Sequence, residues 1–392
     1  MMVQNPPTAK NETPIVIYVP GLGRGQSNSA DRVADVVARV ADSQNPAKRY
    51  NTKTSNDVAA PRGLAVGKTV VDASSDQPVL QFFQFDYAAA LEAPRSTATP
   101  SVAPGMVRSA AFATWAGLKW FSAATRDGKT ARTKFQLALG LVAALALVFA
   151  AVVALYALLV ALGLDQPWLN GVLGTEKQAA KWTFGVTSLG LTITWAALRK
   201  KILALAETTE ELIRFTTNND STADTITVRL DQAIDELRGS EWQGPLHLLG
   251  YSFGSLVLFE AMHPRTNSGL SAKPVETVSS LVTIGCPLDL VRLYEPSYVA
   301  GRQVRRKNLA WTNVFNEADI FASNLKDKAD GEEDGTPMTI GTVAVKATSI
   351  RHTDEKIGAF QIFVSGRTHT GYWGDPTEAS CFDRLVGGWL KK

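Results

Sequence analysis

The sequence of 392 residues is poor in cysteine, in histidine and in net charge. Its two cysteines, Cys286 and Cys381, show neither metal-ligand nor redox spacing, and so few thiols are typical of a reducing compartment. A net charge of +3, without regular interleaving of basic and aromatic residues, argues against nucleic acid as a partner. The polar, proline-bearing N-terminal tail, residues 1–14, has no apolar core typical of a cleaved signal peptide. We therefore expect no nucleic-acid partner and no cleaved leader.

Two glycine-containing segments lack the spacing of the nucleotide-binding motifs that they approach. In segment 21–26, Gln26 stands where the dinucleotide fingerprint needs its third glycine, and no acidic partner is evident. Segment 63–69 falls one residue short of a P-loop and follows no expected strand. We expect neither a bound cofactor nor a metal.

Long uncharged runs, by contrast, are present. Residues 135–164 contain no formal charge and consist mostly of Ala, Leu and Val. As a helix they would extend about 45 Å, more than the roughly 30 Å hydrocarbon core of a bilayer. Residues 182–198 form a shorter uncharged run that threonine and serine dilute. We expect both runs to be transmembrane helices, with the membrane bilayer as a partner; a soluble lid over an acyl pocket is the alternative.

The charges around these runs predict their orientation. Basic residues cluster at 126–134, before the first run, and at 199–201, after the second, whereas loop 165–181 carries balanced charges. By the positive-inside rule, both outer ends are cytoplasmic and the loop is not. Residues 88–134 are interpreted as a linker with a possible interfacial helix.

The residues around Ser252 have the pattern of a strand, a tight turn and a helix. The apolar run 246–249 leads into Gly-Tyr-Ser-Phe-Gly, and a second apolar run follows at once. Gly250 and Gly254 permit the close backbone approach and unusual dihedrals that such a turn requires. The turn would expose the serine hydroxyl and leave the backbone N–H of Phe253 facing a developing oxyanion. We interpret it as a nucleophile elbow, and a purely structural turn is the alternative.

A second oxyanion donor is expected after the first strand. The β-branched run 15–19 reads as a buried strand that ends in a turn at Pro20-Gly21. The backbone N–H of Leu22 is the preferred donor there.

A serine hydroxyl is a poor nucleophile at neutral pH, so it needs a base that an acid orients. In chains with such an elbow, the serine comes first in the sequence, the acid second and the base third. His247 and His263 cannot come third in that order, and His247 is expected to be packed. We prefer His369, in a glycine-bounded loop after the expected strand 360–364. The alternative is His352, in a charged run interpreted as an exposed loop.

For the acid, Asp319 is preferred because it follows the aromatic, β-prone run 311–315 directly. Catalytic residues of open α/β sheets collect at the carboxyl ends of strands. Asp289 is the main alternative and Glu317 the next.

Together these segments resemble the α/β-hydrolase superfamily, in particular its lipase and esterase branch. The resemblance rests on Gly-Tyr-Ser-Phe-Gly at 250–254, Val-Pro-Gly-Leu-Gly at 19–23, Thr-Ile-Gly-Cys-Pro-Leu at 283–288, Asn-Val-Phe-Asn-Glu-Ala-Asp at 313–319 and His-Thr-Gly-Tyr-Trp at 369–373. It covers two blocks, 15–87 and 207–392, but not the hydrophobic insert. Pro20 departs from the family pattern, because many members have histidine before the glycine.

The resemblance implies a mostly parallel central sheet flanked by helices, with Ser252 as nucleophile, Asp319 as acid and His369 as base. It assigns the oxyanion donors to Leu22 and Phe253. We expect a two-pass integral membrane protein with a cytoplasmic serine hydrolase domain of the α/β-hydrolase fold and an inserted hydrophobic two-helix hairpin. It would cleave carboxylic esters, with acyl lipids as one substrate class. Thioester cleavage, acyl transfer and a non-catalytic scaffold stay open, as does the oligomeric state.

The remaining elements are expected from hydrophobic periodicity. Helices are expected at 31–40 and 225–237, and strands at 79–87, 280–284, 310–315 and 340–345. Residues 41–78 are interpreted as a polar surface excursion, and the basic cluster 305–307 as a solvated surface, with contact to anionic lipid as its alternative.

Overall fold

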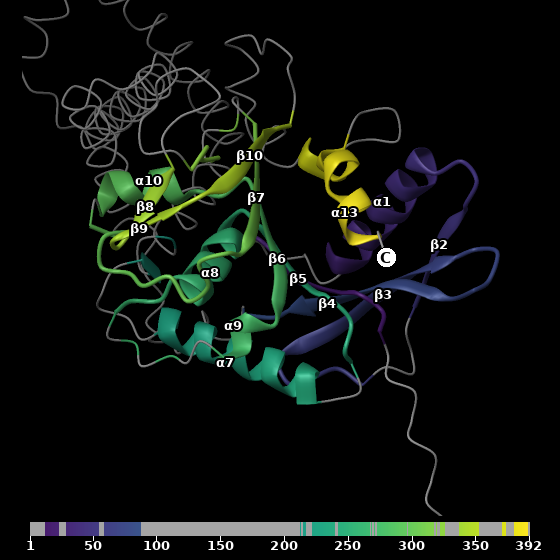
Figure 1. Cartoon of the computed structure of the whole chain (residues 1–392), viewed down its shortest axis with the longest axis horizontal. Coiled ribbons are helices and arrows are strands. Elements are labelled where there is room, and N and C mark those ends of the chain that lie inside the picture. Colours follow the sequence, from purple (N-terminus) through teal and green to yellow (C-terminus); the bar gives the residue numbers. More distant parts are fainter. Residues whose placement is uncertain are drawn as a thin grey trace, which may run out of the picture. The chain divides into compact units, whose positions relative to one another are not determined.

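The structure is a computed structural model of the whole chain (Figure 1). It describes residues 12–22, 29–54, 59–87, 212, 215–216, 222–239, 242–266, 268, 270, 273–295, 297–316, 319, 322–325, 337–352, 371–373 and 380–390. By its contacts the chain divides into two compact units, one made of Met1–Arg95 with Arg214–Lys392 and the other of Ser96–Ile213. All elements below belong to the first unit.

The centre of this unit is an eight-stranded sheet with the order β10-β7-β6-β5-β1-β4-β3-β2. Its strands are β1 (Ile15–Val19), β2 (Tyr50–Lys53), β3 (Leu64–Asp72), β4 (Pro78–Phe85), β5 (Leu246–Tyr251), β6 (Val278–Ile284), β7 (Ala310–Phe315) and β10 (Ala347–Arg351). The six strands from β10 to β4 pair in parallel, and only β3 and β2 run antiparallel to their neighbours. Every residue of β1 and β5 is buried, as expected for parallel strands covered on both faces. The expected α/β class with a mostly parallel sheet is therefore confirmed.

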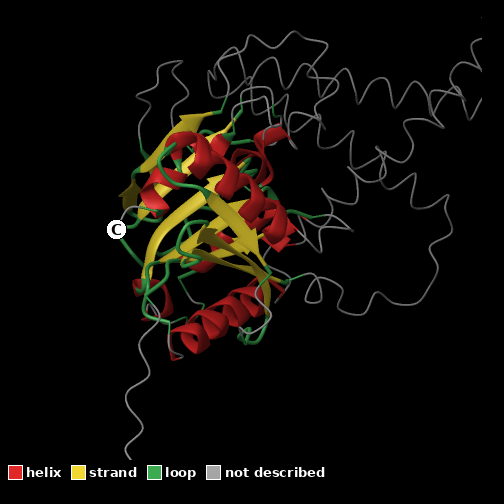
Figure 2. Ribbon diagram, turned by 90° about the vertical axis from the view of Figure 1, so that its right-hand side faces the viewer, coloured by secondary structure: helices red, strands yellow, loops and turns green. Residues whose placement is uncertain are grey.

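Helices cover both faces of the sheet (Figures 1 and 2). The helical elements are α1 (Ser29–Gln44), α7 (Thr222–Gly239), α8 (Phe253–Met262), α9 (Lys273–Glu276), α10 (Leu288–Tyr294), η1 (Gly371–Trp373), η2 (Cys381–Arg384) and α13 (Val386–Trp389). Helix α1 packs with η2 and α13 on one face, and α7 packs on α8 on the other. Since all ten residues of α8 are buried, this helix is part of the core rather than an amphipathic cover.

The expected surface excursion at 41–78 is wrong, because β2 and β3 extend the sheet there. Val70 and Val71 are buried, and β3 pairs with both β2 and β4. A Cβ on Gly67 would lie 3.1 Å from the Cβ of Ala30 and 3.2 Å from that of Phe82. The glycine thus lets α1 pack closely on this strand, and it also interrupts the apolar pattern that would have revealed the strand.

The single strand expected at 340–345 is a separate antiparallel hairpin of β8 (Met338–Ile340) and β9 (Val343–Val345). The chain turns at Gly341, which has a φ of +58° and where a Cβ would lie 2.2 Å from the carbonyl oxygen of Arg302. A glycine in that conformation ends a strand. The neighbouring β10, which the sequence did not indicate, pairs with β7 at the sheet edge.

The expected helices and strands elsewhere are confirmed with small shifts in their bounds. The expected strand 360–364 lies outside the described residues, as do the hydrophobic runs 135–164 and 182–198 with their linker and loop. Among the helices that the structure describes, none has the length and apolar character that crossing a membrane requires.

Candidate functional site

Ser252 occupies a strained turn between β5 and α8. Its φ of 53° and ψ of −121° lie in a region that residues other than glycine rarely adopt. The backbone N–H of Ser252 donates to the carbonyl of Ile284 at 2.8 Å, which ties the turn to β6. Strain of this kind costs about 1–3 kcal/mol and persists only where the surroundings enforce it. The local backbone therefore has the geometry that the sequence pattern predicts for a serine between a strand and a helix, and Ser252 is half-buried there.

The two glycines of the motif are required by close backbone packing. A Cβ on Gly250 would lie 2.7 Å from the Cα of Ser255, and one on Gly254 would lie 2.0 Å from the carbonyl oxygen of Val19. Both distances are too short for any side chain. Gly254 thus brings the first turn of α8 against the end of β1.

The turn after β1 lies directly beside Ser252. Strands β1 and β5 are parallel neighbours, with Val19 in register with Gly250. An ideal Cβ on Gly21 would be 3.1 Å from the Cβ of Ser252, so the turn and the serine are in contact. Leu22 follows, half-buried. Phe253 is the first residue of α8, and its N–H therefore has no acceptor within the helix.

Asp319 is fully buried beyond the carboxyl end of β7. The hydroxyl of Tyr372 donates to its Oδ2 at 2.8 Å and accepts the backbone N–H of Asn316 at 3.0 Å. Burial, together with the negative charge of Asp319, holds the pKa of Tyr372 well above its usual value. Asp319 also acts on Tyr251, the neighbour of the serine, whose pKa is raised first by burial and then by this carboxylate. Asp319 and Ser252 thus both lie at the carboxyl ends of the parallel strands.

Asp289, the main alternative acid, lies in different surroundings from Asp319. Asp289 lies on α10 with its side chain 42% exposed, 3.6 Å from Arg292, an arrangement typical of a surface ion pair. Glu317 lies outside the described residues. Of the carboxylates considered, Asp319 is the one that the structure places in a buried site next to the residue preceding Ser252.

His369, the preferred base, lies outside the described residues. The alternative, His352, follows β10 directly, and its backbone N–H donates to the carbonyl of Phe315 at 2.9 Å. Its ring is half-buried and lies 5.4 Å from that of Tyr372, and the rest of the charged run, residues 353–356, lies outside the described residues. In the order β5-β6-β7-β10 it is three strands from Ser252, about 14 Å across the sheet.

The other two histidines are packed. His247, in β5, is 6% exposed and its Nδ1 lies 2.8 Å from the hydroxyl of Ser280, while burial lowers its pKa to about 4. His263, just after α8, is 2% exposed, and burial with the nearby Arg302 lowers its pKa to about 3. Both imidazoles are therefore neutral at pH 7.

Sequence reasoning missed an aromatic cluster around Phe253. The rings of Tyr87 and Phe215 lie 5.6 and 4.8 Å from the Phe253 ring, and the hydroxyl of Tyr87 donates to the carbonyl of Pro20 at 2.7 Å. These two residues flank segment 88–214 in the sequence. Only the change in composition at 88 pointed to this neighbourhood.

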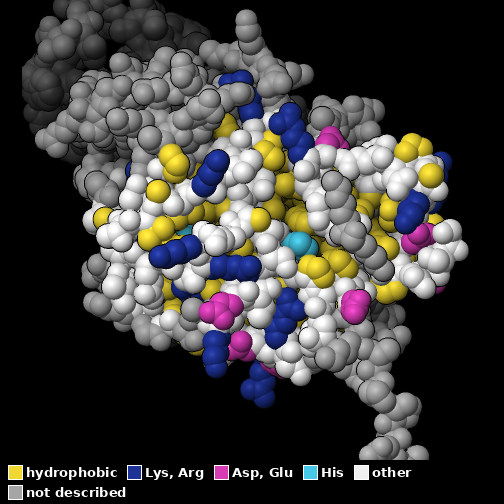
Figure 3. Space-filling model, in the orientation of Figure 1, with side chains coloured by type: hydrophobic (Ala, Val, Ile, Leu, Met, Phe, Trp, Pro, Cys, Tyr) yellow, Lys and Arg dark blue, Asp and Glu magenta, His cyan; other side chains and the backbone are white. Residues whose placement is uncertain are grey.

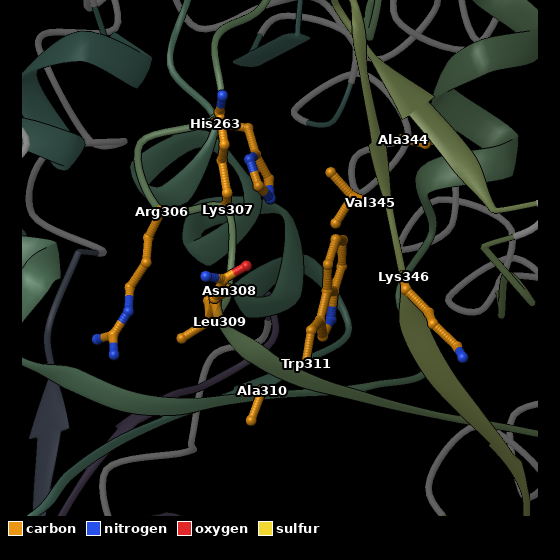
Figure 4. Close-up of a pocket in the computed structure, with 10 residues that line it drawn as sticks. All are labelled: His263, Arg306, Lys307, Asn308, Leu309, Ala310, Trp311, Ala344, Val345 and Lys346. Carbon is orange, nitrogen blue, oxygen red and sulfur yellow. The ribbon is translucent and has the colours of Figure 1, made fainter.

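A cavity of about 330 Å³ opens at the other ends of the strands, where β7 begins (Figure 4). Its walls hold Trp311 and, beside it, the buried ring of His263. It is lined by His263, Arg306, Lys307, Asn308, Leu309, Ala310, Trp311, Ala344, Val345 and Lys346. Because α8 runs from Ser252 to this edge, its length of about 15 Å separates the cavity from the serine.

The basic cluster beside this cavity is largely structural. Arg305 has a side chain only 2% exposed and binds both carboxylate oxygens of Asp231 at 3.0 and 2.9 Å. Arg306 donates to the carbonyl of Glu276 at 2.7 Å. The expectation of a solvated surface is wrong for Arg305. On the face shown in Figure 3, Lys and Arg side chains lie scattered among hydrophobic and uncharged ones.

Among the described residues there is no cluster of three or more His, Cys, Asp or Glu side chains that could hold a metal ion. A comparison of the chain with protein-family models, curated proteins and solved structures finds no match.

Proposed function

We propose that the protein is a serine hydrolase that cleaves carboxylic esters through an acyl-enzyme on Ser252. The observation that carries the proposal is the serine with positive φ at the junction of β5 and α8, in contact with the glycine turn after β1. An elbow of this kind exposes a nucleophile beside backbone donors. A second support is the buried Asp319 near the same ends of the strands, which would supply the acid that the base requires.

In the proposed reaction, His369 removes the proton from the Ser252 hydroxyl as its oxygen attacks the ester carbonyl. The N–H groups of Leu22 and Phe253 stabilise the oxyanion, and Asp319 stabilises the imidazolium. The imidazolium then gives its proton to the leaving alcohol, and the acyl group stays on the serine. Water, activated by the same imidazole, releases the carboxylic acid and regenerates the enzyme.

His352 is the alternative base. It follows β10 directly, and its ring lies 5.4 Å from that of Tyr372. His369 precedes Tyr372 by only three residues, and the hydroxyl of Tyr372 donates a hydrogen bond to Asp319, the proposed acid. Replacing each histidine separately by alanine distinguishes the two, because loss of the base lowers the acylation rate of Ser252 by several orders of magnitude.

The proposed substrate class is an ester that partitions into membranes, such as an acyl lipid. The support is the pair of uncharged runs in the sequence, proposed as a two-pass anchor with a cytoplasmic catalytic domain. The residues that flank this segment, Tyr87 and Phe215, both pack on the neighbour of the serine. Rates on esters of graded acyl length, measured in detergent and in vesicles, test this choice. Thioesters and acceptor alcohols in the same series test thioester cleavage and acyl transfer.

Labelling with a fluorophosphonate tests the nucleophile. We expect a covalent adduct on the full-length protein that maps to Ser252 and disappears in Ser252→Ala. Ser280→Ala is the matched control, since that hydroxyl contacts His247 in the sheet, and it keeps the adduct. A folded protein without an adduct at Ser252 would overturn the proposal in favour of a non-catalytic scaffold.

A further inference from the structure

Tyr372 joins two parts of the site that are far apart in sequence. Its ring is buried in η1, and its hydroxyl makes two hydrogen bonds, to Oδ2 of Asp319 and from the N–H of Asn316. One phenol thus satisfies a buried carboxylate oxygen and a buried amide at the end of β7. A carboxylate that accepts such a bond is fixed in orientation.

The ring of Tyr372 is itself held by its neighbours. The Tyr251 ring meets it edge-on at 6.5 Å, and the His352 ring lies 5.4 Å away. The phenol therefore has little freedom to turn away from the acid. Arg32 and Cys381, from α1 and η2, complete the titratable groups that act on Tyr251.

We infer that Tyr372 is a positioning residue that orients Asp319 toward the catalytic imidazole and tunes the proton affinity of that imidazole. The inference rests on the proposed function. By donating to Oδ2, the phenol sets which way the second carboxylate oxygen points. It also withdraws negative charge from the carboxylate, so that the imidazolium beside Asp319 is stabilised less and gives up its proton more readily.

The protein contains a matched control for this bond. Tyr298 is also buried, and its hydroxyl donates to a buried carboxylate, that of Glu260 on α8. Tyr298→Phe removes the same atom from the same kind of bond, at the far end of α8 from Ser252. It reports the cost of losing such a bond to the fold alone.

The test compares pH profiles of kcat/KM on a soluble ester for Tyr372→Phe and Tyr298→Phe. In Tyr372→Phe we expect kcat/KM to fall about tenfold to a hundredfold, as for a lost bond to a charged group. The acidic limb of the pH profile should move to higher pH, because a carboxylate without the hydrogen bond from Tyr372 raises the pKa of the base. Tyr298→Phe should leave the limb in place.

A second variant covers the case in which Tyr372→Phe does not fold. Fluorinated tyrosine at position 372 keeps the ring and makes the phenol a stronger donor, so the acidic limb should move to lower pH. An acidic limb that stays in place in both variants would show that Tyr372 only supports the fold. That result is distinct from failure of the proposed function, in which the unaltered protein would show no adduct at Ser252.

Discussion

Two buried carboxylates each accept a tyrosine hydroxyl in different surroundings, Asp319 on the side of Ser252 and Glu260 in the last turn of α8. Beyond the first end, a tyrosine hydroxyl donates to the buried carboxylate of Asp319; at the last turn, another donates to Glu260. Glu260 is also bound through both oxygens by Arg302, whose guanidinium lies 3.9 Å from the centre of the Tyr298 ring. At Glu260 a cation balances the charge, and at Asp319 the tyrosine donor is neutral.

We expect this difference to separate a structural role of Glu260 from the chemical role proposed for Asp319. A carboxylate paired with arginine inside the core is compensated and locks its surroundings. A carboxylate oriented by a neutral hydroxyl keeps negative charge to stabilise a neighbouring imidazolium. The strain is also at the first end, in the positive φ of Ser252 and the glycine contacts around it. The fold is therefore expected to lose activity when one end is changed and stability when the other is.

The largest expected effect is on activity, from Asp319→Asn. An amide keeps the shape but cannot stabilise an imidazolium, so kcat/KM should fall about 10³- to 10⁴-fold. The rate of fluorophosphonate labelling provides a second measure. Urea unfolding should change much less than for the next variant, and activity retained within tenfold would exclude Asp319 as the acid.

Arg302→Met tests the other end. Removing the cation leaves Glu260 buried without its arginine partner, and the free energy of unfolding should fall by about 3–5 kcal/mol. At a temperature where the variant is folded, its Ser252 should label at a rate close to that of the unaltered protein. Labelling that is lost in a folded variant would contradict the separation of the two ends.

Gly254→Ala should affect both properties. Its methyl group would overlap the carbonyl oxygen of Val19, so either α8 or the end of β1 must move, at a cost of about 1–3 kcal/mol. Because the oxyanion turn follows β1, labelling should slow at least tenfold. The control is Gly239→Ala, at the end of α7, where a Cβ meets nothing within 4 Å. Equal behaviour of the two variants would show that the contact with β1 is not required.

The smallest effect is expected from His263→Phe. Neither ring nitrogen of His263 has a hydrogen-bond partner in the part of the chain that the structure describes, so an apolar ring should raise the free energy of unfolding by about 1 kcal/mol.

The same variant should change the pH dependence of stability. Burial lowers the pKa of His263 from 6.5 to about 3. Between these pH values the unfolded chain binds more protons than the folded one, so the free energy of unfolding falls as the pH is lowered. His263→Phe should remove about 2 kcal/mol of the loss between pH 7 and pH 5. His247, whose pKa is about 4, contributes in the same direction and remains. Urea unfolding at both pH values measures this, and an unchanged slope would refute it.

The sequence predicted the elements whose signals are local. The glycines around Ser252 and the aromatic run of β7 mark their own positions, because a tight turn and a buried strand each demand particular residues. Strand β3 was missed since Gly67 breaks its pattern, and β10 because its short, mixed sequence pairs only at a sheet edge.

Long-range contacts were beyond sequence reasoning. Tyr372 meets Asp319 across 53 residues and Arg305 meets Asp231 across 74, and nothing in either local sequence names the partner. The three successive basic residues 305–307 are alike in the sequence. The side chain of Arg305 is nevertheless buried, because it pairs with a carboxylate that is distant in the sequence. The position of Asp319 could be singled out from the sequence because it follows a recognisable strand, and its role as the acid stays a prediction.

The contact of Tyr87 and Phe215 with one ring has a consequence for how this chain could be assembled. A segment whose two ends lie next to each other can be exchanged, lengthened or removed without changing the path of any strand. A short bridge over Phe253 would be enough to close the remaining chain. We therefore expect an alteration of the exchanged segment to reach Phe253, the residue beside Ser252, first.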